Sequence, residues 1–96
     1  MLFLIQASDR PDTRDLRSSL RSEHLEMLYR LKAEGRVFDA GARLDSEGHI
    51  VGSVVILEAD DMDGVRAYLD AEVFVHHKVW GDVDISPYRR VQWPAA

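Results

Sequence analysis

Two amphipathic helical segments alternate with four apolar, strand-like segments, and this order constrains the fold of the chain more than any other feature. Residues 1–7, 37–41, 50–58 and 78–85 have the apolar runs or alternation typical of strands. The helical segments lie between the first and second strands and between the third and fourth. This order predicts an α+β fold of the ferredoxin-like βαββαβ type, with two helices on one face of a four-stranded antiparallel sheet.

The helix boundaries are marked by capping and breaking residues. The first helix is predicted from residue 12 or 13 to about residue 34, because a capping residue precedes it and Gly35 follows it. The second is predicted to begin in the aspartate-rich segment 60–63, whose charge suits a helix N-terminus, and to end near residues 70–72. The core-facing positions are predicted to be Leu16, Leu20, Met27, Leu28 and Leu31 in the first helix, and Met62, Val65 and Leu69 in the second.

The second face of the predicted sheet has no helix to cover it. The first strand is nevertheless apolar on both sides, and the third, with four successive apolar residues at 54–57, is nearly so. An uncovered apolar face of that size indicates an interface. We therefore predict a homodimer formed through the open sheet face, a dimeric α+β barrel, which buries about 1,200 Å² or more.

Length and composition exclude several classes of function. The chain has 96 residues, enough for one domain, and a net charge of −5, which disfavours nucleic-acid binding. The basic run Arg10, Arg14, Arg17 and Arg21 is interpreted as a solvated helix face, because acidic residues lie among these arginines.

The chain contains no cysteine, which excludes disulfides and thiolate chemistry. No segment approaches the ~20 apolar residues of a membrane span, so we expect a soluble cytoplasmic protein.

His24 is the first candidate site residue. It falls between Leu20 and Leu28 on the predicted core stripe of the first helix. As a functional group it would act as a general acid or base, because histidine titrates near neutral pH. The alternative is a core histidine held by a hydrogen bond to the backbone.

Glu72 is the second candidate, because it continues the face of Met62, Val65 and Leu69. A carboxylate there could orient His24 and stabilise its charged form, or act as a base itself. The alternative is a helix-end glutamate in solvent. Asp70 is a nearby competitor that lies off the stripe and is expected to face water.

The remaining polar and aromatic candidates predict no cofactor and no metal. His49 lies in a turn, and the adjacent His76 and His77 would face opposite ways on a strand, so they cannot bind one metal ion from one face. Trp80 is predicted to pack on a strand face shared with Asp82 and Asp84. Pro87 is predicted to interrupt this strand, with residues 88–93 extending it as an edge.

Several short motifs together resemble the YCII-related family, in order and over nearly the whole chain. They are Arg21-Ser22-Glu23-His24-Leu25, Glu34-Gly35-Arg36-Val37 with Ala40-Gly41, Gly52-Ser53-Val54-Val55-Ile56, Asp70-Ala71-Glu72-Val73-Phe74 and Ser86-Pro87-Tyr88. The resemblance implies a single YCII-related domain over residues 1–96 and a small dimeric ferredoxin-like protein, similar in fold to muconolactone isomerase. It also implies a site in which His24 matches the family's helix histidine and Arg21 matches an arginine three residues before it.

The family's partner for this histidine is an aspartate in an Asp-Pro-aromatic motif, and here the chain departs from the pattern. Glu72-Val73 stands in place of Asp-Pro. Glutamate keeps the carboxylate but moves it out by one methylene, and the loss of proline frees the backbone that aims it. A displacement of about 1 Å can cost a catalytic constellation about 100-fold in rate.

Two principal hypotheses of function follow. In the first, the chain is a cofactor-independent enzyme for a small, largely apolar molecule, with isomerase- or lyase-type acid–base chemistry next to a carbonyl. His24 would move a proton, Glu72 would orient His24, and Arg21 would hold an anionic or enolate group. In the second, the chain is a non-catalytic dimeric ligand-binding or accessory protein, with His24 and Glu72 as a buried structural pair. An α+β-barrel monooxygenase is a third hypothesis that rests on the fold alone.

Overall fold

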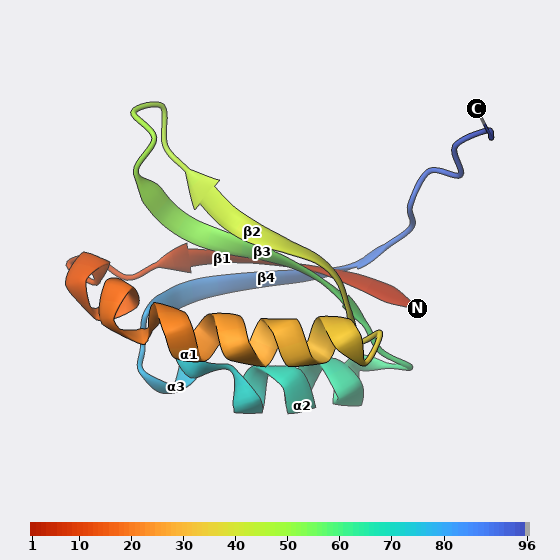
Figure 1. Ribbon diagram of the computed structural model, residues 1–96, viewed down its shortest axis with the longest axis horizontal. Helices are drawn as coiled ribbons and strands as arrows, with labels where there is room; N and C mark the ends of the chain where they lie inside the picture. The colour runs from red at the N-terminus through yellow and green to blue at the C-terminus, as the bar shows by residue number, and fades with distance from the viewer. Residues whose placement is uncertain (96) are drawn as a thin grey trace.

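The predicted βαββαβ order is confirmed in the computed structural model, which describes residues 1–95 (Figure 1). The elements are β1 (Leu2–Asp9), α1 (Arg14–Ala33), β2 (Val37–Leu44), β3 (Ile50–Glu58), α2 (Met62–Ala71), α3 (Val73–His76) and β4 (Trp80–Tyr88). The strands form one antiparallel sheet in the order β2-β3-β1-β4. All three helices lie on one side of this sheet, which is the ferredoxin-like arrangement (Figure 1).

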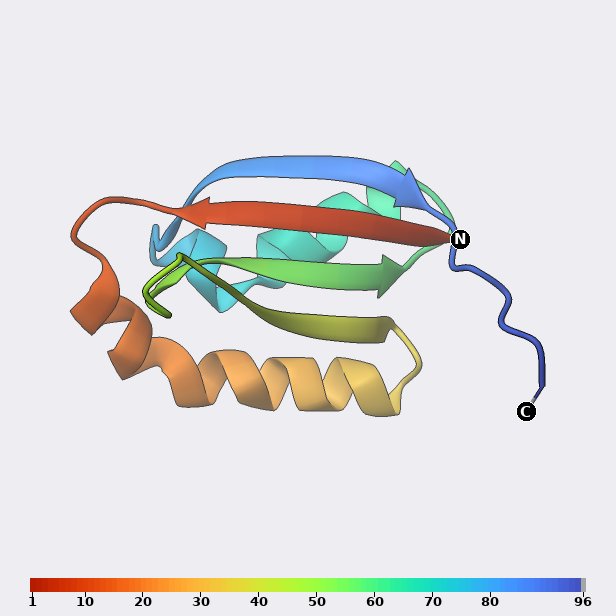
Figure 2. The same cartoon turned by 90° about the horizontal axis from the view of Figure 1, so that it is seen from above.

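The two long helices occupy different parts of the covered face. Figure 2 shows α1 along the β2 side of the sheet, with α2 and α3 behind the central strands. Helix α1 and strands β2 and β3, all from the first 58 residues, therefore lie together at this side of the sheet, and α3 contacts α1 from the side of α2.

Among residues 1–95, no helix is long and apolar enough to cross a membrane.

The helix boundaries lie close to the predicted ones. Thr13 stands at the N-cap position of α1, but its side chain caps no N–H group and its hydroxyl donates to the Arg10 carbonyl instead. Gly35, just past the C-terminus of α1, has a φ of 75° that a side chain would disfavour. The Asp61 carboxylate accepts the backbone N–H of Gly64 and so caps α2. The predicted end of the second helix, near residues 70–72, agrees with the observed end of α2 at Ala71.

Two strands differ from their predicted extent. β2 continues past Gly41 to Leu44, and β4 continues through Pro87 to Tyr88, where it ends. The predicted interruption at Pro87 and the edge extension over residues 88–93 are therefore wrong. Because β4 is an edge strand paired only with β1, one side of its backbone has no partner strand, and a proline can be accommodated there.

The start of β4 carries a bulge that changes which way Trp80 faces. Ala7 pairs with Val83 and Asp9 with Trp80, so two steps along β1 correspond to three along β4. Trp80 is therefore on the core side and only 4% exposed, whereas Asp82 and Asp84 are exposed. The prediction that Trp80 shares a face with these aspartates is wrong, because the extra residue reverses the alternation.

The core lies between the sheet and the helices. Leu20, Met27, Leu28 and Leu31 are buried as predicted. Leu16 is not, because it lies in the first turns of α1, which project past the end of the sheet (Figures 1 and 2). On α2, Met62 is also exposed, and the buried positions are Val65 and Tyr68, with Leu69 packed against them from a half-buried position.

Candidate functional site

His24 and Glu72, 48 residues apart in the sequence, meet in the core. His24 comes from the middle of α1 and is 6% exposed, and Glu72 is fully buried. The Nδ1 atom of His24 lies 2.6 Å from Oε1 of Glu72. The interpretation of Glu72 as a helix-end glutamate in solvent is therefore wrong, whereas Asp70 is exposed as expected. The bonding partner of His24 is a carboxylate rather than the backbone.

The Glu72 carboxylate is held from three directions. It stands between two helices, as the C-cap of α2 and the N-cap of α3. Its Oε1 accepts the backbone N–H of Phe74 at 3.2 Å as well as contacting His24, and its Oε2 accepts the hydroxyl of Tyr68. A buried carboxylate requires such donors, because it has only acceptor sites and loses its water on burial.

These contacts fix the hydrogen-bonding roles of the two ring nitrogens of His24. Because the carboxylate only accepts, Nδ1 of His24 is the donor, and Nε2 of the neutral ring is then a base with a free lone pair. Within residues 1–95, Oδ1 of Asp9 is the only fully buried side-chain polar atom without a partner, and no partner is seen for Nε2. Nε2 of His24 is therefore not completely buried.

Aromatic side chains set the plane of the imidazole. The ring of His24 stacks on Phe74 with centroids 3.9 Å apart and planes 14° apart, and Trp80 meets it edge-on at 6.4 Å. The bulge in β4 is what brings Trp80 to this position. Trp80 in turn donates from Nε1 to the Ser53 hydroxyl, 3.2 Å away. The ring of His24 is thus fixed on its faces by packing and at Nδ1 by a hydrogen bond.

Arg17 lines the candidate site, and the sequence interpretation missed it. Its guanidinium donates to Oδ2 of Asp9 and to the backbone oxygen of Gly52, both at 2.8 Å, and to the hydroxyl of Ser53. It also lies over the ring of Phe74, 4.6 Å from the centroid. The side chain is only 12% exposed, so the prediction of a solvated arginine face is wrong at this position.

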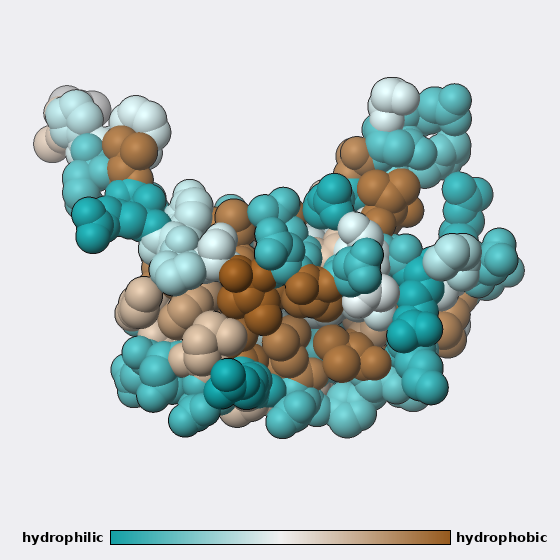
Figure 3. Space-filling view, turned by 180° about the vertical axis from the view of Figure 1, so that it is seen from behind, coloured by the Kyte–Doolittle hydropathy of each residue, from teal (hydrophilic) through white to brown (hydrophobic). Residues whose placement is uncertain are grey.

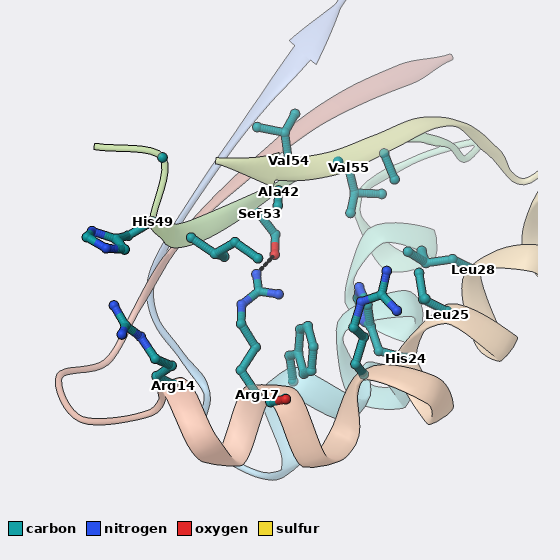
Figure 4. Close-up of a pocket in the computed structure, with 17 residues that line it drawn as sticks. Arg14, Arg17, His24, Leu25, Leu28, Ala42, His49, Ser53, Val54 and Val55 are labelled. Atoms are coloured by element: carbon teal, nitrogen blue, oxygen red, sulfur yellow. Dashed lines mark hydrogen bonds between the residues drawn. The ribbon is translucent and has the colours of Figure 1, made fainter. Parts of the chain in front are cut away.

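A cavity of about 560 Å³ opens between α1 and strands β2 and β3. Figure 4 shows Arg14 and His49 at one end and His24, Leu25 and Leu28 at the other, with Arg17 between them. The strand wall is made of small and apolar side chains, and its residues are Ala40, Gly41, Ala42, Ile50, Ser53, Val54 and Val55. The volume suits a small molecule, and most of the wall suits an apolar one.

The charge of the cavity is positive. Arg14, Arg17 and Arg21 line it, and no aspartate or glutamate does. Arg17 is paired with Asp9, whereas Arg14 and Arg21 make no ion pair within residues 1–95. In a chain of net charge −5, this local excess of cations makes the cavity more attractive to an anion than to a cation. Arg21 lines the same cavity as His24, as the site prediction requires.

The other histidines lie apart from the buried pair. His49, in the turn between β2 and β3, lines the cavity at its outer end. Asp45 contacts it at 3.3 Å, and the pKa of Asp45 is lowered chiefly because its carboxylate accepts the backbone N–H of His49. His76 and His77 are at the end of α3 rather than on a strand, and both are exposed. Among residues 1–95, no three potential ligand side chains are grouped as a metal site would require.

Tyr68 is the second missed residue. It is 2% exposed, and burial, followed by the adjacent charge of Glu72, raises the pKa of its phenol far above the usual value. The hydroxyl therefore stays protonated and acts as a donor to Glu72. The spacing Val65, Tyr68, Glu72 places all three on one helical face, and this signal was available in the sequence.

The backbone at Glu72 has the conformation that a following proline would impose. Glu72 has φ −71° and ψ 121°, which is the extended region favoured before proline, and Val73 is the first residue of α3. We therefore expect Val73→Pro to change the free energy of unfolding by less than about 1 kcal/mol, whereas proline inside a helix costs about 3 kcal/mol or more. Urea denaturation measures this, and a loss of about 3 kcal/mol would show that the turn differs from the one described.

The fold and the site define a class of protein: a small ferredoxin-like domain with a buried histidine–carboxylate pair beside a cationic cavity. The chain belongs to the YCII-related domain family, whose model matches residues 1–89. The family prediction is thereby confirmed.

The chain is similar to curated proteins over nearly its whole length. It is 34% identical to Protein YciI of Escherichia coli, over 95% of this chain and 99% of that one. It is 31% identical to an uncharacterized protein of Haemophilus influenzae, with the same coverage of both chains.

Two solved structures are similar in fold. The first is 5-chloro-2-hydroxyhydroquinone dehydrochlorinase (TftG) from Burkholderia phenoliruptrix, in complex with 2,5-dihydroxybenzoquinone. It has a TM-score of 0.83 and 27% identity, and the match covers 95% of this chain and 96% of that one. The second, Rv0793 from Mycobacterium tuberculosis, has a TM-score of 0.55 and 17% identity over 98% of this chain and 97% of the other, and shows the fold alone.

Proposed function

We propose that this chain is a cofactor-independent enzyme that moves a proton next to a carbonyl group of a small anionic molecule. The observation that carries the proposal is the contact of 2.6 Å between His24 and Glu72 at the wall of a cavity that Arg21 also lines. A base with a fixed orientation, a carboxylate behind it and a cation beside the same space make up the equipment that such a reaction needs.

Each residue has a definite role in the proposed reaction. Nε2 of His24 takes a proton from the carbon next to the carbonyl, the electron pair of that C–H bond forms a C=C bond, and the π pair of the carbonyl moves to its oxygen to give an enolate. Glu72 stabilises the imidazolium that forms, and Arg21 pairs with the negative charge of the substrate or enolate. Return of the proton to another position completes an isomerisation, and departure of a leaving group completes an elimination.

The comparison with solved structures supports the elimination branch of this class. The name dehydrochlorinase denotes an elimination, and that enzyme shares the fold of this chain at 27% identity. The molecule in its complex, 2,5-dihydroxybenzoquinone, is a small ring with carbonyl groups and acidic hydroxyls. A molecule of this kind matches a cavity of about 560 Å³ with an apolar wall and unpaired arginines.

The test is proton exchange with solvent, which requires only the first step of the reaction. Pyruvate and acetoacetate, two small carboxylates with C–H bonds next to a ketone, are incubated with the protein in D₂O. Deuterium incorporation next to the ketone is followed by NMR. We expect exchange above the buffer rate for at least one of the two probes. Exchange at the buffer rate for both would contradict the proposal.

Arg21→Gln is expected to raise KM about tenfold in this assay with a smaller change in kcat. A hydrogen bond to a charged group contributes about 1.5–3 kcal/mol, and the exposed position of Arg21 favours the lower end of this range. Arg30→Gln is the matched control, because Arg30 is an exposed arginine of the same helix that does not line the cavity. An equal KM for the two variants would remove Arg21 from the site.

We also propose that two copies of the chain pair through the sheet face opposite the helices. Leu2, Leu4 and Ile56 remain half-buried on that face although no helix covers it. In Figure 3 the face is hollowed between two projections, the β2–β3 hairpin and the C-terminal segment. Light scattering is expected to give twice the chain mass of 10.9 kDa, and Ile56→Asp is expected to give the mass of one chain. A wild type with the mass of one chain would contradict the dimer.

The second candidate function is a non-catalytic ligand-binding protein, which the low exposure of His24, 6%, favours. In that case His24 and Glu72 form a structural pair. The exchange assay separates the candidates, because a binding protein would bind a probe, detected by saturation-transfer NMR, without exchanging its protons.

A further inference from the structure

We propose that Tyr68 is a positioning residue for His24. Its hydroxyl fixes the Glu72 carboxylate in the orientation in which that carboxylate accepts the Nδ1–H of His24, so that Nε2 is kept free of a proton and open to the cavity. The inference rests on the proposed function, because Nε2 is the atom that takes the proton there.

The geometry assigns a separate partner to each oxygen of Glu72. Oε1 contacts Nδ1 of His24 and accepts the N–H of Phe74, whereas Oε2 accepts the hydroxyl of Tyr68. Both Tyr68 and Glu72 are buried, with 2% and 0% exposure, so no water replaces the hydroxyl from the surface. Tyr68 is thus the only partner of Oε2 within residues 1–95.

The length of the glutamate side chain makes this partner necessary. The last torsion of glutamate is broad, so the carboxylate group turns easily unless both oxygens are bound. Without the hydroxyl, Oε2 would be a buried acceptor with no donor. The carboxylate would then rotate toward another donor or take up a proton, and in both cases it would become a poorer acceptor for the Nδ1–H of His24.

Tyr68 acts without touching the ligand. It is not among the residues that line the cavity, and it reaches His24 only through Glu72. Removing its hydroxyl is therefore expected to change the proton-transfer step rather than binding. On exchange of an accepted probe, we expect Tyr68→Phe to lower kcat about 10- to 100-fold at an unchanged KM, the scale expected of a misplaced catalytic group.

The decisive measurement is the tautomer of His24, which needs no ligand. Ring nitrogen shifts are recorded on the ¹⁵N-labelled full chain at a pH where the histidines are neutral, and His24 is assigned by the signal that His24→Gln lacks. We expect the Nδ1–H tautomer in the wild type and a rise in the Nε2–H tautomer in Tyr68→Phe. Tyr29→Phe is the matched control, because Tyr29 is a 65% exposed tyrosine of α1, and it is expected to leave the tautomer unchanged.

Each outcome decides the proposal. A purely structural role would lower the melting temperature of Tyr68→Phe and leave the tautomer of His24 unchanged, which overturns the inference. A wild-type His24 in the Nε2–H tautomer overturns it without any variant. The expected tautomer change in a protein that exchanges no probe would support the contact through Glu72 and overturn the proposed enzymatic function, so the two failures are distinguishable.

Discussion

His24→Gln is expected to lower kcat for proton exchange by about 10²–10⁴-fold, the contribution that a positioned acid–base residue makes. Glutamine fills much of the space of histidine beside Phe74 and can donate to Glu72, but it has no group that takes up a proton near neutral pH. Binding is expected to change little, because Arg14 and Arg21 remain in the cavity wall. The measurement is the initial rate of deuterium incorporation over a range of probe concentrations.

The matched control for this variant is His77→Gln. His77 is an exposed histidine at the C-terminus of α3 and does not line the cavity, so the exchange rate is expected to equal that of the wild type. Exchange by His24→Gln at the wild-type rate would show that another group takes the proton. His49, which lines the outer end of the cavity beside Asp45, would then be the next residue to replace.

Glu72→Ala is expected to lower the free energy of unfolding by about 3–5 kcal/mol, the cost of breaking a buried pair by removing one partner. The substitution leaves the hydroxyl of Tyr68, the N–H of Phe74 and the Nδ1–H of His24 without an acceptor in the core. It also removes the N-cap of α3. Since domains are stable by about 5–15 kcal/mol in total, this is a large share, and urea denaturation followed by circular dichroism measures it.

Asp70→Ala provides the comparison for Glu72→Ala, because Asp70 is an exposed carboxylate two residues earlier on the same chain segment. Its replacement is expected to change the free energy of unfolding by no more than about 0.5 kcal/mol, as for most surface substitutions. Equal losses in the two variants would mean that the Glu72 carboxylate is not held in the core. The difference between them isolates the effect of burial and of the three hydrogen bonds.

The fold and the buried pair were predictable because both depend on regular periodicity. The alternation of strand and helix patterns determines the βαββαβ order, and helical spacing places His24 and Glu72 on the inner faces of their helices. Two inner faces that cover the same side of a sheet come close together in space. The proximity of His24 and Glu72 could therefore be predicted from the sequence, whereas the two atoms in contact and the distance between them could not.

The residues that surround the pair were not predictable in the same way. A one-residue bulge between β1 and β4 turns Trp80 toward His24, and the alternation of apolar and polar residues in the sequence does not mark where this bulge lies. Arg17 is on the stripe of Leu20 and His24, but a charged residue is expected in water. Its burial is made acceptable by the Asp9 carboxylate, the Gly52 carbonyl and the Ser53 hydroxyl. Partners of this kind come from other elements and become visible only when the chain is folded.

The small side chains of β2 have a consequence for how related chains can diverge. Ala40, Gly41 and Ala42 form part of the cavity wall, and β2 is an edge strand paired only with β3. Ala40 and Ala42 pair with Val55 and Ser53, which are buried on the helix side of the sheet, whereas Gly41 pairs with Val54 and faces the opposite side. A larger side chain at Ala40 or Ala42 would therefore narrow the cavity from the rim of the molecule without any change to the buried pair of His24 and Glu72.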